Sequence, residues 1–315
     1  MRAGAKTVRM LSDPLQVQII RVMAGGFNAL SVPEGYTGEE GPRRRLPRRP
    51  EPEPRGPEGE LHDHDKKYAI TPTGLARVPV AGAIELWLLK ASGGAISYSD
   101  SDPRAEPAIE LLADAWGSGL AHAIAAGPAD RQELIAGCEW SPRSAKRLLA
   151  RLRRAGMVEA ATTPAGAPAH AATEWLRRGI GPLAFAARVE RSDPPEEAKP
   201  VDALDVEAAM LLVAPLLRLD EDLSGACRLA VRLGEPGQRQ PVGVTLRVGE
   251  GRVLSCERGL DPDAGAEAVG ELAPWFTALI DRRTKRLRFD GDRRLARAVV
   301  AEFSRALFDE AAYAH

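Results

Sequence analysis

The sequence predicts an α+β protein, with two mainly helical units of one plan followed by a small unit of strands and helices. Helical motifs in residues 1–92 recur in residues 103–191 at offsets of 101 to 103 residues. A period of this size is typical of a duplicated small domain. Residues 201–315 instead alternate strand-like segments with helix-like ones. Polar segments at 93–102 and 192–200 separate the three units.

Composition sets limits on function. The chain has 315 residues, 44% hydrophobic and 28% charged, which is ordinary for a globular protein. Its formal net charge of -1 excludes a global attraction to nucleic acid, so any such binding needs a local basic patch. Cys138, Cys227 and Cys256 are odd in number and lack CxxC spacing, so we expect neither a disulfide framework nor a zinc site. Without a signal peptide or membrane-spanning window, we expect a cytoplasmic protein.

The first unit contains two helical segments. Residues Val8 to Ala24 predict a helix start followed by an amphipathic helix. Asp13 is the N-cap of this helix and Pro14 its first residue. Further on, residues 68–70 form a short predicted strand. Thr71 then caps a helix that runs to about Lys90 and bends near Pro79.

The second unit repeats this plan. One helix is predicted to run from about residue 105 to Gly127, and its Leu112-Ala113-Asp114 matches Leu11-Ser12-Asp13. His170 to Thr173 then matches residues 68–71, and the helix that follows contains Pro182 where the first unit has Pro79.

Between these matched segments, residues 130–158 carry the clearest functional pattern. A short helix over 131–137 is followed by a turn and by a helix with Ser141 as N-cap, Pro142 as first residue and Gly156 as its stop. Its apolar positions fall on one side, at Ala145, Leu148, Leu149 and Leu152. Its opposite face is basic, with Arg143, Arg147, Arg151 and Arg154, and Lys146 beside them. A strand from Met157 completes the pattern of a winged helix-turn-helix, although a merely solvated arginine face would give the same helix.

Three segments together resemble the HxlR-type winged-helix regulators. LSDPLQVQIIRVMAGG is similar to their first helix, LIAGCEWSPRSAKRLLARLRRAGMVE to their helix-turn-helix, and YAITPTGLARVPVAGAIELW to their wing strand and last helix. The resemblance implies a two-copy regulator that binds duplex DNA through its recognition helices, with the wings against phosphates. We expect groove and phosphate contacts from Ser141, Arg143, Ser144, Lys146 and Arg147. Arg151 and Arg154 lie further along the helix and are expected to meet backbone phosphates.

Residues 31–66 depart from this pattern. They are rich in Pro, Gly, Arg and Glu and stand where the first helix-turn-helix should be, so we expect a disordered arm. The segment keeps the length used by the second unit, which also fits a pair of compensating frameshifts; the alternative frame would then encode a helix patterned with Leu and Arg. His62-Asp63-His64-Asp65 has ligand residue types but no further ligand on a rigid element, so no metal site is expected.

The last unit predicts a small α+β domain. We expect a helix over 201–219, strands over 226–233, 242–248 and 252–257, a helix over 273–280, a strand at 287–289 and a helix over 295–312. PWFTALIDRRTKRLRFDGDRRLARAVVAEF is similar to the closing segment of sterol-carrier-protein-like domains. That resemblance implies a fold able to enclose an apolar ligand beneath its sheet. Trp275, Phe276, Phe289 and Phe303 would line such a pocket, although core packing is the simpler interpretation of their spacing.

These patterns favour a cytoplasmic transcriptional regulator with duplex DNA as its partner and an apolar small molecule as a candidate effector. If the first unit has lost its helix-turn-helix at residues 31–66, a homodimer would restore contacts to two half-sites. We expect no cofactor and no enzymatic activity, because the sequence has no GxSxG, HExxH, P-loop or dinucleotide fingerprint. The alternative is an apolar-ligand carrier whose winged helices bind proteins.

Overall fold

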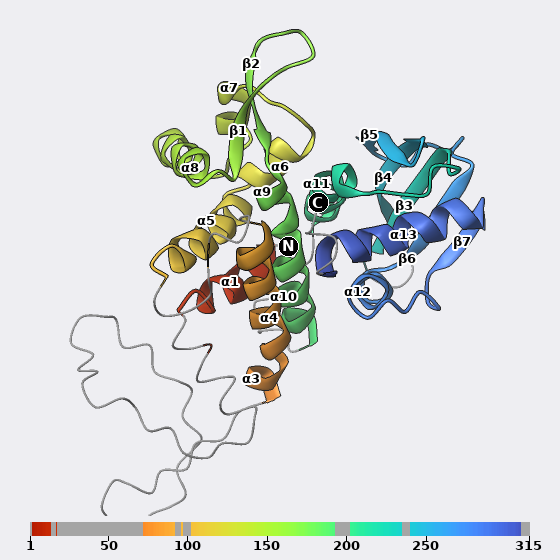
Figure 1. The fold of residues 1–315 in the computed structure, drawn as a ribbon, viewed down its shortest axis with the longest axis horizontal. Helices are drawn as coiled ribbons and strands as arrows, with labels where there is room; N and C mark the ends of the chain where they lie inside the picture. Colours follow the sequence, from red (N-terminus) through yellow and green to blue (C-terminus); the bar gives the residue numbers. More distant parts are fainter. Residues whose placement is uncertain are drawn as a thin grey trace, which may run out of the picture.

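The computed structural model describes residues 2–13, 17, 72–91, 96, 102–192, 202–234 and 240–309. They form an α+β molecule in which a helical half lies beside a half built on a five-stranded sheet (Figure 1). The predicted α+β class is therefore confirmed. No helix among these residues is both long enough and apolar enough to span a bilayer.

The helical half is organised around a central helix, α10, which spans Ile180–Ser192. Against it pack α1 (Arg2–Met10), α4 (Val78–Leu86) and α9 (Glu174–Arg178), while α3 (Pro72–Ala76), α5 (Ala105–Gly117) and α6 (Leu120–Ala125) lie further from it. α1 packs between α5 and α10, and α4 packs along α10. No sequence pattern predicted α1, and the helix start predicted from Val8 is wrong, because residues 8–10 form the last turn of α1 instead.

Two helical stretches that the sequence predicted to match share one local feature. The helical stretch at Pro72–Leu86 is interrupted at Arg77, and the stretch at Glu174–Ser192 is interrupted at Gly179. A proline lies in the first turn after each interruption, at Pro79 and Pro182, and the helix predicted to bend near Pro79 is broken two residues earlier, at Arg77. The two stretches also meet, because the indole nitrogen of Trp87, in the π-helical turn Trp87–Ala91 that follows α4, donates to the carbonyl of Trp175 at 2.8 Å.

Much of the first unit lies outside the described residues. These undescribed parts include the predicted strand at 68–70, the arm at 31–66 with His62 and His64, and most of the helix after Pro14. Val17 is described as helical, and its N–H donates to the carbonyl of Asp13.

The single helix predicted from residue 105 to Gly127 is wrong. Gly119 adopts a left-handed conformation, with φ at 81°, and divides the stretch into α5 and α6. Glycine reaches this conformation without the steric cost that a Cβ would add, so the chain turns there. The match of Asp114 to Asp13 also fails, because Asp114 lies inside α5 whereas Asp13 follows the end of α1.

The sheet has the strand order β5-β4-β3-β6-β7. Its strands are β3 (Gly225–Leu233), β4 (Gln240–Gly249), β5 (Arg252–Arg258), β6 (Ala266–Glu271) and β7 (Arg288–Gly291). β3 and β6 run parallel and all other neighbours are antiparallel. The sequence predicted four of these strands but not β6, whose Ala-Glu-Ala-Val-Gly-Glu lacks β-branched and aromatic side chains apart from one valine.

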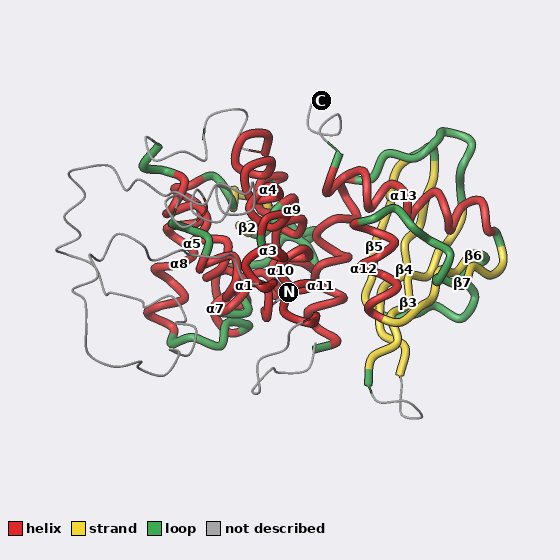
Figure 2. Tube along the Cα trace, turned by 90° about the horizontal axis from the view of Figure 1, so that it is seen from below, coloured by secondary structure: helices red, strands yellow, loops and turns green. Residues whose placement is uncertain are grey.

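Three helices cover the sheet: α11 (Ala203–Val213), α12 (Leu272–Ile280) and α13 (Arg293–Phe308). α11 contacts β4 on one side and α6 on the other, so it lies between the two halves (Figure 2). It ends well before Leu219, because a short 3₁₀ turn at Ala214–Leu216 contains Pro215.

Buried polar contacts join the two halves. The ring nitrogen Nε2 of His122 in α6 lies 2.6 Å from Oδ1 of Asp205 in α11, and both residues are buried. The guanidinium of Arg177 donates to the carbonyl of Leu212 at 3.0 Å, and that of Arg178 donates to the carbonyl of Ala306 at 2.5 Å. Apolar packing continues across the same boundary in one core cluster.

Candidate nucleic-acid interface

The residues predicted to form the helix-turn-helix fold as two helices joined by a turn, α7 (Arg131–Ala136) and α8 (Pro142–Ala155), followed by a hairpin of β1 (Val158–Thr162) and β2 (Pro168–Ala172). A reciprocal capping box starts α7. Asp130 accepts from the backbone N–H of Gln132 at 2.6 Å and of Glu133 at 2.8 Å, and the Glu133 carboxylate accepts from the N–H of Asp130 at 2.9 Å. These bonds fix the entry of the chain into the motif.

Local signals also set both ends of α8. The hydroxyl of Ser141 accepts from the backbone N–H of Ser144 at 3.3 Å, and Pro142 occupies the first helical position. Gly156 ends the helix with φ at 79°. The predicted limits of this helix are confirmed.

The two faces of α8 differ as predicted. Ala145, Leu148, Leu149 and Leu152 are at most 3% exposed and pack toward the other helices of the unit. Opposite them, Arg143, Arg147 and Arg154 are exposed along the outer face. None of the three has an ion pair with another described residue, so their guanidinium groups are free to meet an anion.

The remaining predicted contacts lie around this outer face. Lys146 is exposed on one flank of α8. Arg151 lies on the other flank, where its Nη1 is 3.5 Å from Oδ2 of Asp114, a carboxylate that also pairs with Arg9. Ser141 donates its hydroxyl to that of Ser144 at 3.0 Å, so both hydroxyls have partners within the helix terminus.

Two cations that the sequence analysis passed over belong to the same surface. Burial lowers the pKa of His170 in β2, and the nearby charges of Arg153 and Arg131 lower it further. Arg153 is exposed on the Lys146 flank of α8, and Arg131 begins α7. Helical spacing could have shown Arg153, but the approach of Arg131 to β2 depends on tertiary structure.

The hairpin contributes no cation. Between Val158 and Ala172 the chain has no lysine or arginine, and Glu159 is exposed on β1. At the tip, the hydroxyl of Thr163 accepts from the N–H of Ala167 at 3.1 Å, which holds the turn closed. The expected contact of this wing with phosphate would therefore rest on backbone N–H groups and hydroxyls.

A hollow of about 480 Å³ opens between α7 and the start of α8. Trp140, in the turn between them, is 36% exposed there, and Lys146 lies at the rim. The remaining lining residues are Gln132, Ile135, Ala136, Cys138 and Pro142. This site combines an apolar floor with a cation, and the sequence analysis did not anticipate it.

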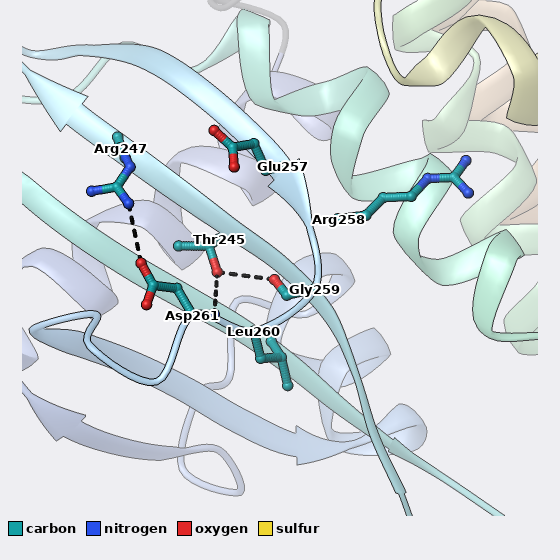
Figure 3. Close-up of a pocket in the computed structure, with 7 residues that line it drawn as sticks. All are labelled: Thr245, Arg247, Glu257, Arg258, Gly259, Leu260 and Asp261. Atoms are coloured by element: carbon teal, nitrogen blue, oxygen red, sulfur yellow. Dashed lines mark hydrogen bonds and ion pairs between the residues drawn. The ribbon is translucent and has the colours of Figure 1, made fainter.

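A second hollow, of about 310 Å³, lies on β4 and β5 (Figure 3). The hydroxyl of Thr245 donates to the carbonyl of Gly259 at 2.9 Å and accepts from the N–H of Asp261 at 2.8 Å. Arg247 pairs with the Asp261 carboxylate at 3.1 Å. Arg258 points the other way, toward the helical half, where it donates to the carbonyl of His122 at 3.2 Å. The lining is polar and largely hydrogen-bonded within the protein.

The four aromatic residues predicted to line a ligand pocket, Trp275, Phe276, Phe289 and Phe303, are each at most 9% exposed. The indole nitrogen of Trp275 donates to the carbonyl of Ala230 at 2.9 Å, and the guanidinium of Arg297 lies 5.5 Å from the ring centre of Phe289. Neither hollow described above is lined by them.

Within the described part of the chain, no three His, Cys, Asp or Glu side chains are grouped closely enough to hold a metal ion. Burial raises the pKa of the Cys227 and Cys256 thiols to about 12, so both stay protonated at neutral pH. Comparison with protein-family models, with curated proteins and with solved structures gives no match.

Proposed function

We propose that the protein is a DNA-binding transcriptional regulator that lays α8 in the major groove of duplex DNA. The observation that carries the proposal is the exposed stripe of Arg143, Arg147 and Arg154, which faces away from the buried leucines of the same helix. A major groove about 12 Å wide admits one α-helix, and cations along its outer face then meet base edges and phosphates.

The position of each cation along α8 suggests its role. Arg143 and Arg147 lie one turn apart in the first half of the helix, where a guanidinium can donate two hydrogen bonds to guanine O6 and N7. Arg154 lies in the last turn and is better placed for backbone phosphate. Arg151 would exchange Asp114 for a phosphate, because its pair at 3.5 Å is exposed and therefore weak.

We also propose a sensor role for the sheet half, with an apolar small molecule as effector. The buried contacts between α6 and α11 support it, because they provide a route from the sheet to the helix-turn-helix. The proposal assigns the chain to the cytoplasm and gives it no enzymatic step and no cofactor. A homodimer would supply two half-site contacts.

The test is binding to duplex DNA. A sequence selected from a random pool, and the DNA upstream of its own gene, are titrated with the full chain. We expect Arg143→Ala or Arg147→Ala to weaken binding to the selected site by about 1–3 kcal/mol, or roughly 5- to 150-fold. Arg252→Ala, which removes an exposed arginine from β5, is the matched control and should leave affinity unchanged.

Unchanged affinity in both α8 variants would remove α8 as the recognition helix. A protein that binds neither DNA, and that releases an apolar ligand on organic extraction, would favour the carrier alternative.

A further inference from the structure

A second group of cations surrounds β7 in the sheet half. Between Asp281 and Arg297 the sequence has eight lysines and arginines against three aspartates. These residues form the loop before β7, the strand itself and the first turns of α13. Such a density is unexpected in a chain whose net charge is only -1.

Only some of these cations have acidic partners. Arg282 pairs with Asp309 at 3.3 Å, Arg288 with Asp290 at 2.7 Å, and Arg294 with Asp222 at 2.6 Å. The others are exposed, and among the described residues no carboxylate lies within ion-pair distance of them. We name this set the β7 rim: Arg283, Lys285, Arg286, Arg293 and Arg297.

The rim flanks the edge of the sheet. β7 pairs only with β6, so its outer edge is unpaired within the described sheet. Arg283, Lys285 and Arg286 precede the strand, whereas Arg293 and Arg297 follow it on α13. A strand of four residues is about 13 Å long, and α13 turns back over it, because the guanidinium of Arg297 lies 5.5 Å from the ring centre of Phe289 in β7.

The chemistry of the rim fits a phosphate backbone. None of the exposed large apolar side chains of the described residues lies in it; they are Leu75, Leu89, Trp140, Leu204 and Leu254. Membrane-surface segments combine their cations with such apolar anchors, so a membrane is the poorer fit. Like charges held close together repel one another, and a polyanion with regularly spaced charges removes that repulsion.

The rim and α8 lie at opposite ends of the molecule. Two views at right angles both show β7 at one end of the long axis and α8 at the other (Figures 1 and 2). A short duplex held by α8 therefore cannot also cover the rim.

We propose that the β7 rim binds the phosphate backbone of a second duplex segment, so that one chain bridges two DNA segments. The first of these contacts rests on the function proposed above, and the second does not. Because the rim lacks exposed aromatic or apolar groups, its contact is with phosphate and is independent of base sequence.

A bridging experiment tests this. The selected duplex is immobilised, full-length protein is bound to it, and retention of a fluorescent duplex of unrelated sequence is measured over a series of salt concentrations. We expect retention that falls steeply with salt. A triple variant with Arg283, Lys285 and Arg286 each changed to Ser should reduce retention about tenfold or more, yet leave binding to the selected duplex within about twofold.

The matched control removes the same charge elsewhere, by changing Arg104, Arg232 and Arg252 to Ser; these residues are exposed at scattered sites. Retention should be unchanged in this control. Should the triple variant fold poorly by circular dichroism, Arg286→Glu alone gives the same comparison. Full retention of the fluorescent duplex by a folded rim variant overturns the proposal. The proposal is also overturned if polyglutamate, added as a competitor, releases the fluorescent duplex as readily as unlabelled DNA does.

The outcomes of this experiment distinguish the α8 proposal from the β7 rim proposal. If the chain binds no selected site but still binds random duplex through the rim, the α8 assignment fails and the rim assignment stands. If the rim variant loses both duplexes while the control keeps both, the rim belongs to a single primary site, and bridging is overturned.

Discussion

At the scale of single residues, the pKa of His170 depends on the positive charge of Arg153 on the Lys146 flank of α8. Burial is the largest cause of its lowered pKa, followed by Arg153 and then Arg131. Arg153→Gln removes one of these cations, so we expect the pKa of His170 to rise. Proton NMR titration of the His170 ring measures it. Arg147→Gln, on the outer face of the same helix, is the control and should leave the titration unchanged.

The same shift has a consequence for stability. A histidine whose folded pKa lies below its ordinary value of 6.5 resists protonation in the native state. The stability that neutral His170 contributes to the folded protein is present above pH 6.5. It is lost as the pH falls, because the unfolded chain then binds the proton more readily than the folded one. Arg153→Gln should therefore also reduce this loss of stability in acid. A titration curve for His170 that is unaltered by the substitution would contradict the position of Arg153 beside β2.

Single residues were predictable where they act on their own neighbours. Ser141, Pro142 and Gly156 define α8 through bonds and conformations within a few residues, so the sequence contains their signals. The partner of Arg151 was not predictable, because Asp114 lies 37 residues away in the chain. Gly119 was missed for a different reason: an apolar helical pattern continues across it, and glycine alone does not state which conformation it adopts.

At the scale of elements, α1 depends on a glycine. A Cβ on Gly4 would lie 2.5 Å from the carbonyl oxygen of Leu183 and 2.8 Å from the backbone nitrogen of Ala187, so α1 approaches the backbone of α10 directly. We expect Gly4→Ala to lower the free energy of unfolding by about 1–3 kcal/mol, because backbone atoms on both sides must shift. Urea denaturation gives the stability, and amide exchange in α1 shows whether this helix loosens first.

Lys6→Ala is the matched control, since Lys6 is an exposed position on the same helix. It should keep both the stability and the exchange rates of the parent protein. Equal stability of the Gly4→Ala variant and the parent would show that α1 does not pack on α10 at this distance.

Elements with their own periodicity were predicted, and elements made by their neighbours were not. α8 has a stripe of four buried positions, and the hairpin of β4 and β5 has alternating residues around Gly249-Glu250-Gly251. β6 has neither signal, and it forms because β3 and β7 satisfy its backbone from both sides. α1 was missed because Arg, Lys and Gly alternate with its apolar residues, and its buried side is evident only against α5 and α10.

At the scale of the whole molecule, the two halves could be separated in the sequence but not assembled from it. Composition indicates the polar segment at 192–200 between them. The contacts between them include the hydrogen bond of His122 with Asp205, which are 83 residues apart and have buried side chains. No local sequence pattern around either residue predicts such a contact. The helix-turn-helix is therefore attached to the sheet half through α6 and not only through the linker.

On the proposed function, the number of α8 helices bound to each DNA duplex can be determined from the salt dependence of binding. The described residues of one chain offer five exposed cations on α8 without ion pairs, namely Arg143, Lys146, Arg147, Arg153 and Arg154, and the wing adds none. If each neutralises one phosphate, log K should fall against log salt with a slope of about -4.5. Fluorescence anisotropy on a short selected duplex measures this slope, in the variant with Arg283, Lys285 and Arg286 each changed to Ser, so that the β7 rim does not contribute. A slope near -9 with two chains on each duplex would instead indicate a dimer with two heads. A slope close to zero would mean that the outer face of α8 meets no phosphate.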